Sequence, residues 1–115
     1  MPLLIQEVPA TKAPVELLLL ADPSEEKIRS YLSRSKCFVA SSDAVVVGAC
    51  VVQPRGKGTH ELMSIAVHPF CQKSGYGTVL LKWVIDFFRN SGARQLEVGT
   101  GVPPISWTAI RGSQR

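Results

Sequence analysis

The stretch that decides the fold is Ile65-Ala66-Val67-His68-Pro69-Phe70-Cys71-Gln72-Lys73-Ser74-Gly75-Tyr76-Gly77. Its apolar start stops at Pro69, a short polar turn with two glycines follows, and a long amphipathic pattern begins at Thr78. This order predicts a strand, a loop and then a helix. Such a loop turns backbone N–H groups and the positive end of a helix toward one point, an arrangement that binds phosphate groups.

The two glycines suit this loop to close contact with a ligand. Gly75 and Gly77 have no Cβ, so their backbone can approach an anion and adopt a positive φ. We expect the N–H groups from Gln72 to Thr78 to face one hollow, with the hydroxyl of Thr78 and the charge of Lys73 beside it. An alternative is that the glycines only allow tight packing of a helix on a strand. The pattern lacks the third glycine of a dinucleotide fingerprint, and it is not a P-loop.

The segments around the loop predict an α/β domain with a mixed, mostly antiparallel sheet and flanking helices. The apolar periodicity predicts a long helix over residues 74–91, and Gly92 suits the left-handed position just past its end. A strand at Gln95–Val98 would then run parallel to the one at His60–Val67, because a helix separates them. Asp22 is the expected N-cap of an earlier helix over residues 23–34. The remaining expected strands are Leu3–Val8, Cys37–Ala40 and Val45–Val52.

Composition limits the class of protein. The chain has 115 residues, enough for one domain, with 45% hydrophobic residues and a net charge of +4. The apolar run Val15–Leu20 is too short to cross a membrane, so we expect no membrane association. No basic cluster is interleaved with aromatic residues, which argues against a nucleic-acid partner, although a small basic nucleic-acid-binding protein stays the third alternative. Three cysteines without a CxxC pair predict no metal site and fit free thiols in the cytoplasm.

The sequence Val67-His68-Pro69, followed by Gln72 to Thr78, resembles motif A of the GNAT superfamily of N-acetyltransferases. The hairpin before it and the strand at Gln95–Val98 also fall where that family places them. The resemblance covers about residues 3–101. It implies a GNAT-like acetyl-CoA-binding domain over residues 1–101 and an irregular tail over 102–115, with the family's C-terminal helix and strands missing.

The resemblance also implies where acetyl-CoA, the co-substrate, would bind. The backbone of the last strand residues would pair with the pantetheine arm like an added strand. These residues are Ile65, Ala66 and Val67. The loop would hold the pyrophosphate through Gln72, Lys73, Ser74, Gly75, Tyr76, Gly77 and Thr78.

Glu61 is the candidate general base. An amine with a pKa near 10.4 costs about 4.6 kcal/mol to deprotonate at pH 7, so a nearby carboxylate that takes the proton helps the transfer. Several family members carry their base at the matching strand position. Strand alternation predicts Glu61, Met63, Ile65 and Val67 on one face. The alternative is a solvated carboxylate near the start of the strand.

The tail is the least regular part of the sequence. After Gly101 come two prolines and no expected helix or strand, so we expect the sheet to end at Gln95–Val98. That strand would leave an open edge unless Ile105 and Trp107 or a second chain cover it, which makes a homodimer through this edge possible. The expected function is transfer of acetyl from acetyl-CoA to a primary amine of a small molecule or peptide. A non-catalytic acyl-CoA-binding or dimeric interaction module is the alternative.

Overall fold

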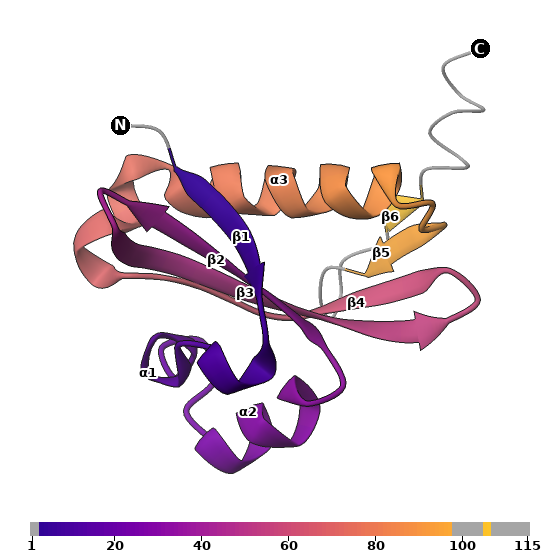
Figure 1. Ribbon diagram of the computed structural model, residues 1–115, viewed down its shortest axis with the longest axis horizontal. Helices are drawn as coiled ribbons and strands as arrows, with labels where there is room; N and C mark the ends of the chain where they lie inside the picture. The colour runs from indigo at the N-terminus through magenta and orange to yellow at the C-terminus, as the bar shows by residue number, and fades with distance from the viewer. Residues whose placement is uncertain (1–2, 98–104, 107–115) are drawn as a thin grey trace.

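The computed structural model describes residues 3–97 and 105–106, with the backbone alone described at 72–74 and 105–106. A six-stranded sheet lies between helices on its two faces, and its strand order is β1-β2-β3-β4-β5-β6. Figure 1 shows α3 along one face and α1 with α2 on the other. Neighbouring strands are antiparallel, except that β4 and β5 are parallel. The prediction of a mixed, mostly antiparallel α/β sheet is confirmed.

The elements follow in the order in which the chain forms them. They are β1 (Leu4–Val8), a 3-10 helix η1 (Ala10–Lys12), α1 (Val15–Leu18), α2 (Glu25–Leu32), β2 (Lys36–Ser42), β3 (Val45–Gly56), β4 (Thr59–Val67), a 3-10 helix η2 (Pro69–Ser74), α3 (Tyr76–Asn90), β5 (Gln95–Glu97) and β6 (Ile105–Ser106). None of the helices in the described ranges is long and apolar enough to cross a membrane.

The sheet does not end where the sequence predicted. Leu96 and Gln95 of β5 pair with Ile105 and Ser106 of β6. The chain therefore covers the edge of β5 itself, which removes the edge-pairing reason for a homodimer. A strand of two residues has too little periodicity to be recognised in sequence. Trp107 lies outside the described residues, and the predicted boundary at residue 101 stays a prediction.

The start of α2 also differs from the prediction. Ser24, with φ −102° and ψ 107°, is the N-cap, and its side chain accepts a hydrogen bond from Lys27 N at 3.2 Å. Asp22 instead caps the turn before the helix, because its Oδ1 accepts a hydrogen bond from Ser24 N at 3.2 Å. The acidic residue thus shapes the turn that leads into the helix, and the helix itself begins at Glu25. Asp22 and Ser24, which lie two residues apart, can both form caps, and this made the sequence ambiguous.

The end of α3 agrees with the prediction. Gly92 has φ +89°, and the N–H groups of Gly92 and Ala93 donate to the carbonyls of Arg89 and Phe88 at 3.2 and 3.0 Å. This pair of bonds is a Schellman motif, which satisfies carbonyl groups at the end of a helix. It directs the chain straight into β5.

Two apolar clusters hold the layers together. Burying each large apolar side chain contributes about 1.5–3 kcal/mol. The α3 face buries Phe38, Ala40, Val47, Cys50, Val52, Leu62, Leu80, Val84, Phe88, Ala93 and Leu96. The α1/α2 face buries Leu17, Leu18, Ile28, Tyr31, Leu32, Cys37, Val39, Ala49, Val51 and Ala66. Cys37 and Cys50 are buried free thiols, as predicted, and burial raises the pKa of Cys37 to about 11 and that of Cys50 further.

Candidate functional site

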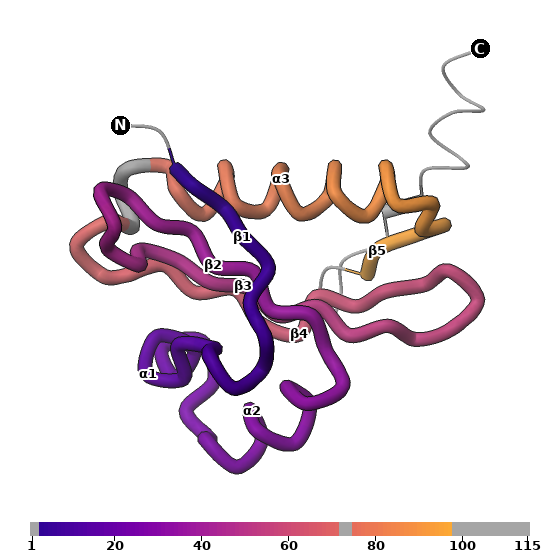
Figure 2. Tube along the Cα trace, viewed as in Figure 1, coloured from indigo at the N-terminus to yellow at the C-terminus, as the bar shows by residue number. Residues whose placement is uncertain are grey.

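The candidate site begins where β4 turns into α3. Figure 2 shows this turn at the end of the molecule where α1 also lies. His68 opens the turn, and its Nδ1 accepts a hydrogen bond from Phe70 N at 3.3 Å. Gly75 closes it in the left-handed conformation, with φ 77° and ψ 9°. The chain thus enters α3 from a 3-10 helix, and α3 begins at Tyr76, two residues later than predicted.

Three backbone N–H groups lead the first turn of α3. The first hydrogen bond of the helix runs from Val79 N to Gly75 O at 3.1 Å. The N–H groups of Tyr76, Gly77 and Thr78 therefore lie ahead of the helix's own ladder. Gly75 and Thr78 are exposed, and Gly75 offers no side-chain cap. The turn can thus present these donors, together with the positive end of the helix, to an anion.

The two glycines have different roles. A Cβ on Gly77 would lie 3.4 Å from Cγ2 of Val67, so Gly77 allows α3 to pack tightly on β4. A Cβ on Gly75 would meet nothing within 4 Å, and its φ of +77° is the reason for glycine there. The packing alternative therefore applies to Gly77, whereas Gly75 shapes the loop. The side chains of 72–74 lie outside the described residues, so their pyrophosphate role stays a prediction.

The edge of β4 forms the second part of the site. Thr59, His60 and Glu61 pair with β5, which is described as far as Glu97, while β4 runs on to Val67. On its other edge, β4 stays paired with β3 as far as Val67. The backbone of Ile65 and Ala66 thus lies beyond the described ladder with β5, beside the first turn of α3. This is where the sequence predicts the pantetheine contacts.

A β-bulge in β4 overturns the predicted alternation of side chains. Leu62 pairs with Val52 and Ser64 with Val51, so Met63 is an extra residue in the strand. Leu62 and Ile65, three residues apart, consequently both face α3, whereas Met63 packs on the opposite cluster. Glu61 precedes Leu62 and therefore faces the α1/α2 side. The prediction that Glu61 shares a face with Ile65 is wrong, because the extra residue shifts the pattern by one position.

Arg55 holds the Glu61 carboxylate. Glu61 Oε1 accepts from Arg55 Nε at 2.8 Å and also from Arg55 Nη2. The Glu61 side chain is 30% exposed, so it is neither fully solvated nor buried. A half-exposed pair of this kind contributes about 1 kcal/mol or less to stability. Its consequence is geometric, because it fixes one carboxylate oxygen.

Sequence reasoning did not single out two buried hydroxyls on the same side of the sheet. Tyr31 OH and Ser64 Oγ are buried and have no hydrogen-bond partner within the described residues. Burial raises the pKa of Tyr31, the neighbouring Ser64 hydroxyl lowers it in part, and the charge of Asp22 raises it. The signal in the sequence was a serine within the apolar strand at His60–Val67.

His60 lies on the other face, against α3. Its ring lies 4.5 Å from that of Phe88 between centroids. Burial lowers the pKa of His60, a backbone hydrogen bond with Gly58 raises it in part, and the charge of Lys36 lowers it. This environment favours the neutral imidazole, which fits a packed aromatic ring.

Comparisons with known proteins now identify the family. The model of the acetyltransferase (GNAT) family matches residues 9–103. An uncharacterized N-acetyltransferase of Bacillus subtilis, YvbK, is 37% identical over 86 residues, which cover 75% of this chain and 56% of that protein. The chain thus spans about half the length of this curated relative.

Solved structures show the same similarity. A Bacillus cereus IAA acetyltransferase has a TM-score of 0.82 and 35% identity, covering 98% of this chain and 74% of that one. A GNAT family acetyltransferase of Elizabethkingia anophelis, with acetyl-CoA bound, has a TM-score of 0.79 and 34% identity, covering 97% and 72%. A Bacillus subtilis acetyltransferase in complex with CoA has a TM-score of 0.78 and 32% identity, covering 98% and 74%. The chain belongs to the GNAT family of acetyltransferases.

Proposed function

We propose that this chain binds acetyl-CoA and transfers its acetyl group to a primary amine. The observation that carries the proposal is the first turn of α3. After the left-handed Gly75, its first three N–H groups make no hydrogen bond within the helix. The turn lies beside β4, which continues beyond the residues described as paired with β5. Two of the similar structures were solved with acetyl-CoA or CoA, which supports the same ligand here. The free cysteines fit a cytoplasmic site of action.

In this proposal the turn and the strand hold different parts of acetyl-CoA. The pyrophosphate accepts hydrogen bonds from the loop that ends at Thr78, and the side chains of 72–74 add to this contact. The pantetheine arm runs along the backbone of Ile65–Val67 as an added strand. Backbone donors of this segment polarise the thioester carbonyl, as an oxyanion hole does.

Glu61 is the proposed general base. The Glu61 oxygen that is not bonded to Arg55 accepts a proton from the acceptor ammonium through a water molecule. The neutral nitrogen then attacks the thioester carbonyl, the amide bond forms and CoA leaves as its thiolate, which takes up a proton. The base offsets the cost of about 4.6 kcal/mol for deprotonating an alkylamine at pH 7.

Two measurements test the proposal in sequence. Isothermal calorimetry with CoA should show saturable binding, and no heat at millimolar CoA would reject the whole proposal. A thiol-release assay with acetyl-CoA and a panel of primary amines then measures transfer. Binding of CoA without thiol release from any amine would leave a non-catalytic acyl-CoA-binding module, the alternative function.

A further inference from the structure

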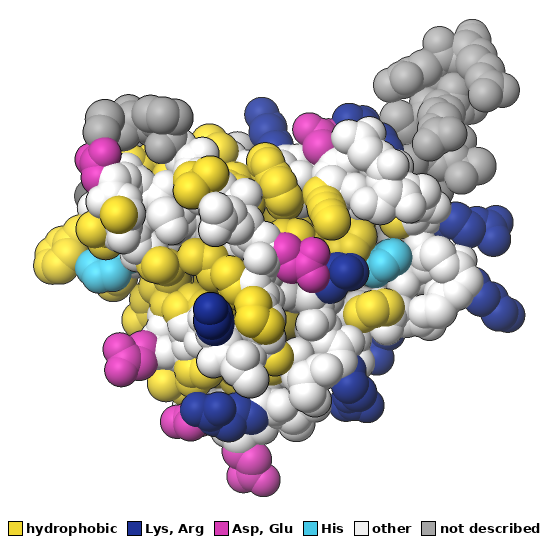
Figure 3. Space-filling view, viewed as in Figure 1, with side chains coloured by type: hydrophobic (Ala, Val, Ile, Leu, Met, Phe, Trp, Pro, Cys, Tyr) yellow, Lys and Arg dark blue, Asp and Glu magenta, His cyan; other side chains and the backbone are white. Residues whose placement is uncertain are grey.

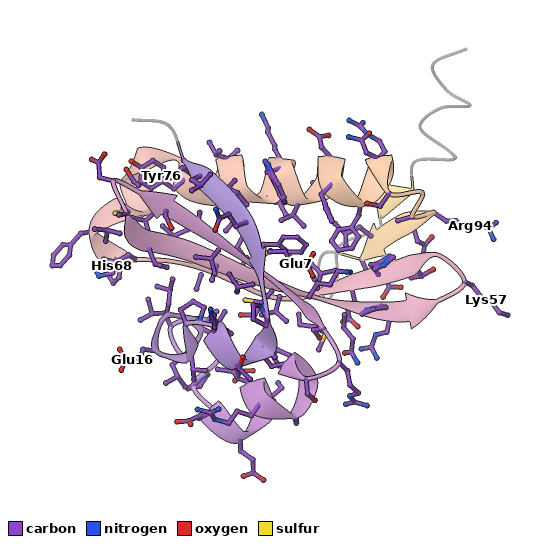
Figure 4. The ribbon with its side chains drawn as sticks, in the orientation of Figure 1. Glu7, Glu16, Lys57, His68, Tyr76 and Arg94 are labelled. Atoms are coloured by element: carbon purple, nitrogen blue, oxygen red, sulfur yellow. The ribbon has the colours of Figure 1, made fainter. Side chains whose placement is uncertain are left out.

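An open pocket of about 340 Å³ adjoins the end of β4 on the α1 side. Figure 4 shows His68, which follows β4, and Glu16, which projects from α1, at this same end of the molecule. The space-filling view shows hydrophobic side chains gathered there beside a histidine (Figure 3). The lining residues are Pro14, Glu16, Leu17, Leu20, Val46, His68 and Pro69.

The lining and its surroundings are mainly apolar. Leu20 is 53% exposed and Val46 is 39% exposed, and the neighbouring Phe70 is 92% exposed. Large apolar side chains gathered in the open around a pocket usually mark a binding surface, because leaving them in water is unfavourable. The pocket is therefore suited to an apolar group.

The pocket lies some distance from the point of transfer. His68 follows Ile65 by three residues, which corresponds to about 10 Å along a strand. Under the proposed function the reacting nitrogen lies beside Ile65, because the thioester follows the pantetheine arm there, and its proton passes to Glu61 through a water molecule. A small amine at that point cannot also fill the pocket.

We infer that the acceptor is an elongated primary amine with an apolar group about 10 Å from its nitrogen, and that the pocket beside His68 holds this group. This inference rests on the proposed function and adds the shape of the acceptor to it. A peptide with a free N-terminus and a long alkylamine share this chemistry.

Glu16 adds a charge preference. It is the one carboxylate among the described lining residues, and no lysine or arginine is among them. A positive charge just beyond the apolar group would therefore be favoured. Because Glu16 is exposed, we expect the preference to be about two- to fivefold.

A position scan tests the distance. Glycine hexapeptide amides carry one leucine at position 1, 2, 3, 4 or 5, and kcat/KM is measured with saturating acetyl-CoA. An extended peptide advances about 3.3–3.6 Å per residue, so leucine at position 3 or 4 should give the highest value, by about tenfold. In a series of alkylamines of increasing length, kcat/KM should likewise rise only once the chain is long enough to span about 10 Å. No dependence on position or length in either series would overturn the inference.

A matched pair of variants tests whether this pocket holds the apolar group. Val46→Asn puts a polar group into the pocket, whereas Val45→Asn changes an adjacent residue of the same strand that is 61% exposed and does not line the pocket. Val46→Asn should remove the preference for leucine at position 3 or 4, and Val45→Asn should keep it. Equal effects of the two variants, or none, would contradict the assignment of the pocket.

Calorimetry separates failure of this inference from failure of the proposed function. CoA is titrated first, and the best and worst peptides are then titrated into the CoA-loaded protein and into the protein alone. Absence of CoA binding rejects the proposed function. If the affinities of the two peptides differ by about tenfold and Val46→Asn abolishes this difference, the result supports the pocket even without turnover. Equal peptide affinities reject the pocket even where transfer is observed.

Discussion

The two ends of β4 differ in what builds them. At its C-terminal end, Pro69 stops the strand and Gly75 sets the start of α3, so neighbouring residues in sequence make the anion-facing turn. Toward its N-terminal end, the Arg55–Glu61 pair and the bulge at Met63 in the middle of the strand depend on β3. The structure of the first end is determined by residues close in sequence, and that of the second by the pairing of β4 with β3.

This difference teaches that donor binding and proton transfer should be separable. Changes in the turn should affect CoA affinity, whereas changes near Glu61 should affect turnover. Two variants, Glu61→Gln and Gly75→Val, test this separation. Two more, His60→Phe and Tyr31→Phe, test the packing on the two faces of the sheet and should have smaller effects.

Glu61→Gln should lower kcat by about 10²- to 10⁴-fold, because the proposed base is removed. CoA affinity, measured by calorimetry, should change by less than about twofold. Glu7→Gln is the control, because Glu7 is also an ion-paired carboxylate, 3.4 Å from Lys36 Nζ. Unchanged turnover of Glu61→Gln would show that another group takes the proton.

Gly75→Val should weaken CoA binding at least about tenfold, because a β-branched residue rarely adopts φ +77° and the turn must rearrange. Gly92→Val is the matched control at the other end of α3. Its φ is +89°, and a Cβ there also meets nothing within 4 Å. Both variants should lose about 1–3 kcal/mol of stability, but only Gly75→Val should lose CoA affinity. Equal CoA affinities in the two variants would show that the turn at Gly75 does not contribute to CoA binding.

His60→Phe tests the α3 face of β4 through pH. The pKa of His60 is lowered in the folded state, so the unfolded chain binds its proton more readily. Stability should therefore fall as pH drops below about 6.5, and the fall in Tm should be smaller in His60→Phe. Thermal unfolding at pH 5 and pH 7.5 measures the effect. An identical pH dependence in both proteins would count against a half-buried neutral imidazole at position 60.

Tyr31→Phe should have the smallest effect. The Tyr31 hydroxyl is buried without a partner in the described part of the chain, so its removal should change the free energy of unfolding by about 1 kcal/mol or less, and not necessarily downward. Tyr31→Ala is the contrast and should cost about 3–5 kcal/mol through the lost ring. Urea unfolding distinguishes the two. A large loss in Tyr31→Phe would reveal a hydrogen bond to Ser64.

Much of the fold could be predicted because its signals are short-range. The long helix, the left-handed Gly92 and the parallel strand after it follow from apolar periodicity and from a glycine that tolerates positive φ. The start of α2 was less certain, since Asp22 and Ser24 can both cap a turn and only the packed backbone selects Ser24. The strand at Ile105–Ser106 could not be foreseen, because two residues show no period.

By itself, the sequence determined the family, the order of the main strands and the glycine-shaped turn before α3. The reason is that breakers, caps and periodicity act between residues close in the chain. Only the tertiary structure decided on which face Glu61 lies and which cation holds it. A single extra residue at Met63 inverts the pleat, and its position is set by the pairing of β4 with β3 rather than by any local preference.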